Sequence, residues 1–152
     1  MGGFIILGAL LVASDMRTMR LPDSLVLSIW GLGIVRVLLL DLPLIDALVS
    51  TIVLFFVMRA FKYYYARSRG REGIGLGDVK LIAALGPWVD PFLLPEFLMC
   101  IGLAGGIWAL GLRLIGRRGY FPYAPSIFLG YLLTSNLVPQ GTQETLFLQL
   151  SA

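Results

Sequence analysis

The residues best placed for chemistry are two aspartates, Asp15 and Asp78, each at the edge of an apolar stretch. Asp78 lies between the glycine-rich stretch 73–77 and an apolar helical pattern, and Asp15 ends the first hydrophobic run of the chain. An ionisable side chain facing a bilayer core is expensive unless it meets a polar cavity or a partner. We therefore take the two carboxylates as partners in one candidate site.

Two carboxylates at one membrane face indicate acid-base chemistry. Like charges in a low-dielectric site do not easily both ionise, so one acid keeps a proton while the other is charged. The charged member can take a proton from a water molecule that attacks a peptide carbonyl, while the protonated member donates to the carbonyl oxygen. The sequence leaves open which aspartate holds the proton.

The residues that several other catalytic systems require are absent from the sequence or too few. The chain has no histidine, which removes Ser-His-Asp and Cys-His nucleophiles and His-ligated zinc. Its one cysteine, Cys100, lies in an apolar run and is predicted to be a small buried hydrophobe, so neither an intrachain disulfide nor a thiolate metal cluster is expected. We expect no metal site.

The composition predicts an integral membrane protein. Of its 152 residues, 58% are hydrophobic, far more than a soluble domain needs to fill its core. No linker or low-complexity run divides the chain, so we expect one domain over residues 1–152. The first apolar run lacks preceding positive charge, which favours a span over a cleavable signal peptide.

The expected fold is an all-α polytopic bundle of about six transmembrane helices. The expected segments are Gly2–Ser14, Pro22 to about Leu40, Leu44–Phe61, Asp78–Val89, Phe92–Ile115 and Pro122–Leu137. The fourth is short, which indicates burial among other helices or a tilted or partly re-entrant path.

The charged residues predict the orientation of these segments. Lys and Arg gather at the first, third and fifth connections, as cytoplasmic loops do. Both termini should therefore lie outside, with Asp15 and Asp78 at the same cytoplasmic boundary. The basic run from Arg67 to Arg71 is better explained by anionic lipid than by nucleic acid, for which no motif appears.

The remaining polar residues have plainer interpretations. Asp23 follows Pro22 in the first turn of a predicted helix, where capping is the favoured role, and Asp41 and Asp90 are interpreted likewise as helix starts. Lys80 either biases Asp78 toward ionisation or extends to the membrane interface, with the interface favoured. The glycines before Asp78 either form a flexible connection or let backbone and substrate approach the acid closely.

At these residues the sequence resembles the type IV prepilin peptidases and their preflagellin relatives, the GxGD membrane aspartyl proteases. Three blocks carry the resemblance: Asp15 with Arg17 and Leu21-Pro22-Asp23; GLGDVKLIAALGPWV, which begins at Gly75; and PYAPSIFLG, which runs from Pro122 to Gly130. The resemblance implies that Asp15 and Asp78 are the catalytic residues and that Gly75 and Gly77 are the motif glycines. Pro22, Asp23, Lys80, Pro122 and Pro125 would support the motif or the substrate.

The resemblance also implies a substrate and a location. The activity would be cleavage of the leader from prepilins or pseudopilins at the cytoplasmic face of the inner membrane, without a metal or organic cofactor. Asp23 replaces the family's usual Asn, and Tyr123-Ala124 replaces Phe-Gly, which affects expected substrate fit rather than the acid pair. The paired CxxC insertion of the N-methylating members is absent, so the chain resembles the short, peptidase-only form.

Three matters stay open. A signal-peptide-peptidase or presenilin-like protease shares the GLGD pattern, although no Pro-Ala-Leu block is found. A non-catalytic membrane transport or assembly subunit could use an acid pair for proton or cation passage, but no acid is predicted at mid-bilayer. The oligomeric state, including a homo-oligomer, is not determined by the sequence.

Overall fold

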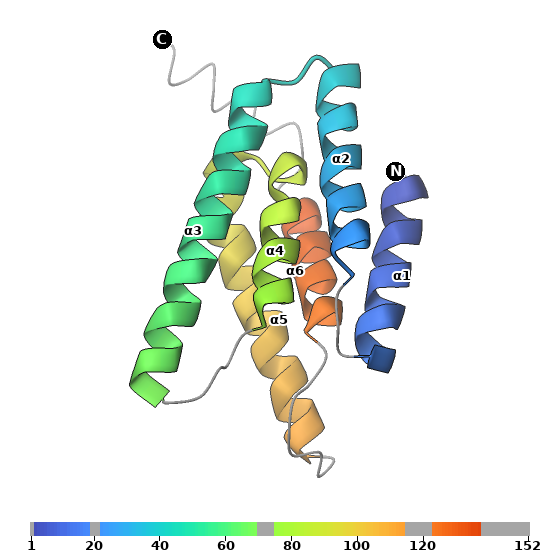
Figure 1. Cartoon of the computed structure of the whole chain (residues 1–152). Helices are drawn as coiled ribbons and strands as arrows, with labels where there is room; N and C mark the ends of the chain where they lie inside the picture. Colours follow the sequence, from blue (N-terminus) through green and yellow to red (C-terminus); the bar gives the residue numbers. More distant parts are fainter. Residues whose placement is uncertain (1, 19–21, 70–74, 115–122, 138–152) are drawn as a thin grey trace.

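The chain folds into helices throughout its described part. A computed structural model describes residues 2–18, 22–69, 75–114 and 123–137, which hold six α-helices, two short 3-10 helices and no strand (Figure 1). The elements are α1 (Gly2–Thr18), α2 (Asp23–Leu39), α3 (Leu44–Arg69), α4 (Leu76–Ala84), η1 (Gly86–Trp88), η2 (Pro91–Leu93), α5 (Leu94–Leu114) and α6 (Ala124–Leu137). The predicted all-α class is therefore confirmed.

Successive α-helices run up and down the bundle. The C-terminal ends of α1, α3 and α5 and the N-terminal ends of α2, α4 and α6 point to the same end, the lower one in Figure 1. We call this the site end, because Asp15 lies near the end of α1 and Asp78 near the start of α4. The alternation brings the two acids to one end, as the charge pattern predicts.

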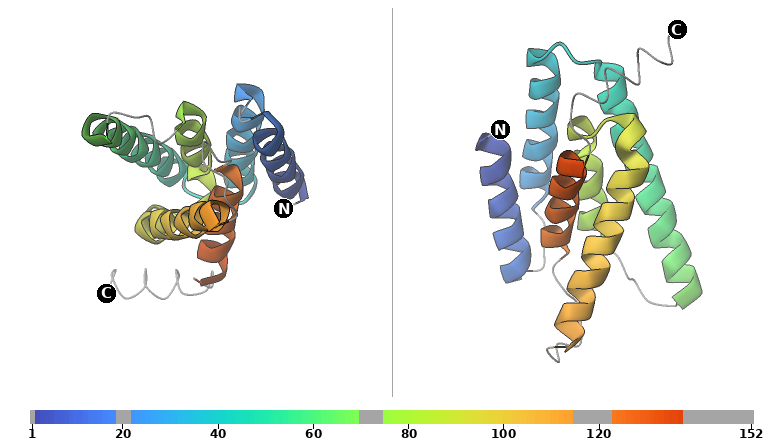
Figure 2. Two further views of the ribbon diagram at one scale, coloured as in Figure 1. Left: turned by 90° about the horizontal axis from the view of Figure 1, so that it is seen from below. Right: turned by 180° about the vertical axis from the view of Figure 1, so that it is seen from behind.

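The short helix α4 lies at the centre of the bundle. It packs against α2, α3 and α6, and Figure 2 shows it between α2 and α3 when seen from below. Most of its side chains are buried, including the run Leu81–Leu85 that carries the chain out of the helix. A helix that is apolar on all sides is stable where other helices cover it. Nine residues rise only about 14 Å, so α4 is too short to cross a bilayer alone.

The chain leaves α4 through a close contact with α3. A Cβ atom on Gly86 would lie only 2.4 Å from the backbone nitrogen of Thr51, so only glycine permits this approach. The hydroxyl of Ser50, which is fully buried, donates to the Val89 carbonyl at 3.1 Å and ties the same region to α3. These contacts fix the direction of α4 and hence the position of its first turn.

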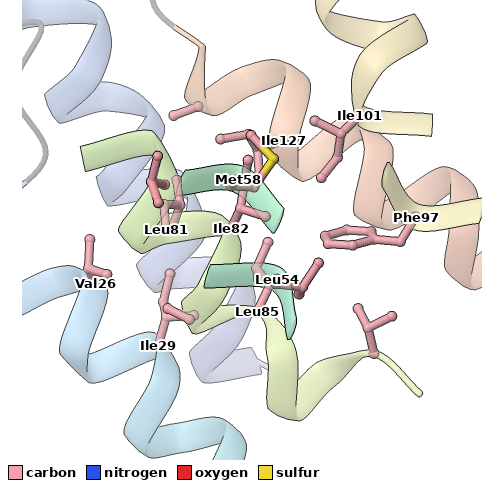
Figure 3. Packing of buried hydrophobic residues seen from close by; sticks show 14 of the residues in the cluster. Val26, Ile29, Leu54, Met58, Leu81, Ile82, Leu85, Phe97, Ile101 and Ile127 are labelled. Atoms are coloured by element: carbon pink, nitrogen blue, oxygen red, sulfur yellow. The ribbon is translucent and has the colours of Figure 1, made fainter. Parts of the chain in front are cut away.

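The core is formed where five helices meet around α4. Figure 3 shows Ile29 of α2, Leu54 of α3, Phe97 of α5 and Ile127 of α6 converging on Leu81 and Ile82 of α4 and on Leu85, which directly follows it. Because each helix contributes side chains to one cluster, the described helices form a single packed body.

The outer surface is strongly apolar. Ile45, Phe56, Ile107 and Leu114 are each between 64% and 80% exposed. Two stretches, Leu44–Ser68 and Pro91–Leu114, are long and apolar enough to cross a membrane, while Ile6–Asp15 and Ala124–Ser135 are apolar but shorter. A water-facing surface rarely carries so many large apolar side chains, whereas a lipid-facing one requires them.

Several predicted boundaries differ from the structure. The first helix continues past Ser14 to Thr18, so that Asp15 lies within it, and α3 continues past Phe61 to Arg69. Charged and tyrosine side chains end an apolar run but do not end a helix, since backbone hydrogen bonding continues through them. Hydropathy therefore underestimates the lengths of α1 and α3.

Asp41 does not start a helix, contrary to prediction. It lies just after α2 with φ of 49°, and the next residue, Leu42, donates its N–H to the Val37 carbonyl at 2.9 Å. This is the Schellman arrangement that ends a helix, with Asp41 at the left-handed position usually taken by glycine. Asp90 does act as predicted, because its carboxylate accepts the Phe92 N–H at 3.0 Å at the start of η2.

Candidate active site

Asp15 is a buried acid near the end of α1. It is 5% exposed, and its Oδ2 atom accepts a hydrogen bond from the backbone N–H of Ala124 at 3.0 Å. Ala124 is the first residue of α6, so this N–H is one of the donors that a helix start leaves without an intrahelical partner. The positive end of the helix dipole adds to the attraction for a carboxylate. The start of α6 thus holds the Asp15 carboxylate in place through a backbone hydrogen bond.

Asp78 lies in the first turn of α4 and folds back toward the loop before it. Its Oδ2 atom accepts the backbone N–H of Gly75 at 3.2 Å. A Cβ atom on residue 75 would lie 3.0 Å from that oxygen, so the absence of a side chain lets the backbone approach the acid. Of the two interpretations of the glycines, the geometry at Gly75 favours close approach. Gly77 is the second residue of the helix, next to the acid.

The two carboxylates influence each other. Burial, as the larger cause, and the negative charge of Asp15 together raise the pKa of Asp78 from 3.8 to about 6. The Gly75 N–H and the Lys62 ammonium act in the opposite direction. Asp78 lies outside the two helices that are long enough to cross a bilayer. The two acids therefore differ in their surroundings. Asp15 accepts a hydrogen bond from the start of a helix, whereas the surroundings of Asp78 favour its protonated form.

Two residues of this site were not predicted from the sequence. Lys62 of α3 is the cation that acts on Asp78, although it is also one of the basic residues that set the predicted orientation. Tyr123 lies near Asp78 as well, since burial and the Asp78 charge both raise the pKa of its phenol. The sequence signal for Tyr123 was its place in the third block, where it departs from the family's Phe.

Lys80 and Asp23 form a separate feature. The Lys80 ammonium binds both carboxylate oxygens of Asp23, at 2.8 and 2.9 Å, and joins α4 to α2. The predicted capping role of Asp23 is wrong, because its carboxylate takes part in this ion pair and no side chain caps α2. Lys80 is thus paired with Asp23, and it is not among the groups that shift the pKa of Asp78. With Asp23 74% exposed, the pair is expected to contribute about 1 kcal/mol or less.

The ion pair borders an open apolar groove between α2, α3 and α4. The groove has a volume of about 330 Å³ and is lined in part by Trp30, Phe55 and Ala84. Neither Asp15 nor Asp78 lines it. The groove and the acid pair therefore lie on different sides of α4.

The prolines of the motif lie at helix starts. Pro22 precedes α2 with φ of −63°, and its carbonyl accepts the first N–H groups of the helix, from Leu25 and Val26. Pro125 is the second residue of α6, where its missing N–H costs nothing. Pro122 lies outside the described residues. The described prolines set where the helices of the site begin and do not themselves touch a reacting atom.

The residues present suit proton transfer better than metal binding. Among the described residues, no group of three histidine, cysteine or acidic side chains is arranged to hold a metal ion. The arrangement at the site end is two interacting carboxylates, one accepting a helix-start N–H and one with a raised pKa, inside an all-helical bundle with an apolar surface. Such a pair can act as base and acid in one reaction.

Comparison with known proteins gives the family. A profile described as the type IV leader peptidase family matches residues 3–110, a range that contains both aspartates. The chain belongs to this family, and with its apolar helices it is a membrane protein.

Named relatives agree with the family assignment. The chain is 35% identical over 119 residues to the prepilin leader peptidase/N-methyltransferase of Aeromonas salmonicida, covering 78% of this chain and 40% of that protein. It is 32% identical over 139 residues to the protein of the same name from Pectobacterium carotovorum, with coverages of 85% and 48%. The Burkholderia pseudomallei protein of that name is 34% identical over 140 residues, with coverages of 86% and 44%. The chain thus spans less than half the length of these relatives. No solved structure matches it.

Proposed function

We propose that this protein is an aspartic endopeptidase that removes the leader peptide of type IV prepilins or pseudopilins. The family and the names of the relatives support the reaction and the substrate class. The observation that carries the proposal is the electrostatic interaction between Asp15 and Asp78, which lie 63 positions apart in the sequence. Peptide hydrolysis by a carboxylate pair needs neither a metal nor an organic cofactor.

The different surroundings of the two acids support different roles. Asp15 accepts an N–H bond at a helix start, which fixes the position of its carboxylate and suits the base. Asp78, with its raised pKa, suits the acid. In the first step Asp15 takes a proton from water, the water oxygen bonds to the scissile carbonyl carbon, and Asp78 donates its proton to the carbonyl oxygen. In the second step the proton held by Asp15 passes to the amine nitrogen as the C–N bond breaks. Asp78 takes back a proton from a hydroxyl of the tetrahedral intermediate as the carbonyl re-forms, which restores both acids.

We further propose that the protein crosses the inner membrane several times with the acid pair at the cytoplasmic face. Two long apolar helices and two shorter ones support a multi-pass arrangement of about six segments, in which α4 is a short central segment covered by the others. Lys62 and Arg67 near the end of α3 and Arg113 near the end of α5 lie toward the site end, whereas Asp46 and Glu96 begin those helices at the other end. This asymmetry supports a cytoplasmic site end and external termini.

The proposal is tested by replacing each acid with its amide. Asp15→Asn and Asp78→Asn should each reduce leader cleavage by at least about 10²- to 10⁴-fold, because the reaction loses its base or its acid. The double variant should lose little more than either single one, since the acids act as a unit. The assay is gel-shift cleavage of a purified prepilin by detergent-solubilised enzyme.

Asp90→Asn is the matched control. Asp90 caps η2 toward the other end of the bundle, and an asparagine caps equally well, so this variant should cleave at the wild-type rate. Variants are compared at equal expression and with their melting temperatures measured. Substantial cleavage by either Asp15→Asn or Asp78→Asn would refute the proposed mechanism.

A further inference from the structure

The start of α6 interacts with both acids of the pair. Ala124, which is fully buried, donates its N–H to Asp15, and the preceding residue, Tyr123, lies near Asp78. We propose, building on the proposed peptidase function, that Tyr123 is a positioning residue of the acid pair: its ring packs over Gly105 of α5 and fixes the point where α6 begins. The position of that point decides whether the Ala124 amide reaches Asp15.

The contact between Tyr123 and Gly105 is unusually close. A Cβ atom on residue 105 would lie 2.5 Å from Cε2 of the tyrosine ring and 2.6 Å from its hydroxyl oxygen. The ring therefore occupies the space that any other residue at 105 would need. The hydroxyl also points to the Ile101 carbonyl, one helical turn earlier on α5, at 3.5 Å. The ring is thus held along one face of α5.

Tyr123 also defines the first turn of α6. Its carbonyl accepts the N–H groups of Ser126 and Ile127 at 3.1 and 3.2 Å and the Ser126 hydroxyl at 2.6 Å. Moving Tyr123 therefore moves the whole first turn, and the Ala124 amide with it. The helix start is held from α5 by the ring and is linked to Asp15 of α1 by the amide.

The consequence for catalysis follows from the distances. A hydrogen bond of 3.0 Å between Ala124 and Asp15 weakens steeply if the donor moves by a fraction of an ångström or turns away. Misplacing a catalytic group by about 1 Å can reduce a rate about 10²-fold. Because the Tyr123 ring fits only against a glycine, the contact with Gly105 allows little variation in where α6 begins.

Two adjacent glycines of α5 provide a matched test. A Cβ atom on Gly105 would collide with the Tyr123 ring, whereas a Cβ atom on Gly106 would meet nothing within 4 Å. Both lie in the middle of the same helix, so alanine raises intrinsic helix propensity equally at each. Gly105→Ala should lower kcat for prepilin cleavage by about 10- to 100-fold with little change in KM. Gly106→Ala should stay within about twofold of wild type.

Two measurements separate positioning from a general loss of structure. Tyr123→Phe keeps the ring and should retain kcat within a few-fold, while Tyr123→Ala removes the ring and should match the loss in Gly105→Ala. The second measurement is the pH profile of kcat. The charges of Asp15 on α1 and Lys62 on α3 act on Asp78, and the Asp78 charge acts on Tyr123. Moving the ring should let water reach this acid. The alkaline limb of the profile should therefore move to lower pH in Gly105→Ala, which a uniform loss of folded enzyme would not produce.

The outcomes distinguish this inference from the peptidase function itself. The positioning role of Tyr123 is overturned if Gly105→Ala cleaves as fast as Gly106→Ala, or if Tyr123→Ala cleaves as fast as wild type. In that case, inactive Asp15→Asn and Asp78→Asn variants would still support the peptidase function. If those two aspartate variants remain active, the proposed peptidase mechanism fails first. A kcat loss in Gly105→Ala and Tyr123→Ala with a shifted pH profile and an unchanged Gly106→Ala supports the role of Tyr123.

Discussion

The raised pKa of Asp78 makes a prediction about stability that does not depend on a substrate. The folded protein holds this proton up to about pH 6, whereas the ordinary pKa of the side chain is 3.8. Ionising Asp78 therefore costs the folded state more than the unfolded state. The penalty is absent below about pH 4, develops as pH rises toward 6 and is complete above 6. Each pH unit between the two values corresponds to about 1.4 kcal/mol, so the full penalty is about 3 kcal/mol.

Asp78→Asn should remove this penalty. An asparagine oxygen can still accept the Gly75 N–H, so the local bond is kept while the charge is lost. At pH 7.5 the variant should be more stable than wild type by about 3 kcal/mol, or roughly 6–12 °C in melting temperature for a chain of this size. At pH 4 the two proteins should melt together. Thermal unfolding in a mild non-ionic detergent at both pH values measures the difference.

Two further variants show whether the reasoning is right. Asp23→Asn removes another site-end acid, but one that is 74% exposed and paired with Lys80, so it should not change the pH dependence. Asp78→Asn in an Asp15→Asn background should gain less than in wild type, because part of the penalty comes from the Asp15 charge. The explanation is refuted if Asp78→Asn changes the melting temperature equally at pH 4 and pH 7.5.

Two other predictions concern the whole chain. The positive charge near the ends of α3 and α5 predicts that the site end is cytoplasmic and the C-terminus external. An alkaline phosphatase fused after Ala152 should therefore be active, and one inserted near Arg67 should be inactive. The reverse pattern would contradict the proposed orientation. The single cysteine predicts that the purified chain cleaves a prepilin without transferring a methyl group from S-adenosylmethionine. Mass spectrometry of the new N-terminus decides this, and a methylated product would show that the paired CxxC insertion is not required.

Much of the architecture could be predicted from the sequence because it depends on local composition. Apolar runs, separated by charged or proline-containing breaks, indicated six helices, and each overlaps a helix of the structure although several boundaries differ. The short fourth run was expected to be buried among other helices, and α4 is. Alternating helix direction then placed Asp15 and Asp78 at one end, since each helix reverses the chain. These features follow from hydropathy and connectivity alone.

Helix ends and polar partners were less predictable. Asp23, Asp41 and Asp90 all looked like helix starts, but only Asp90 caps one. Asp41 ends α2 because the chain must turn sharply there, and Asp23 is drawn to a lysine 57 positions away. A short polar side chain can serve any of these roles, and the choice depends on which groups the packed helices bring within reach.

The chemistry of the site depends most on tertiary structure. The sequence indicated two acids and a glycine motif, but it left open which of the two aspartates holds the proton. The packing of α6 brings the Ala124 amide to Asp15, and the burial of α4 together with the nearby Asp15 charge raises the pKa of Asp78. The same packing brings Tyr123 to Gly105 and Lys62 to Asp78. A carboxylate's preference for its proton is set by burial, charge and hydrogen bonding over a few ångströms, and residues far apart in sequence supply all three.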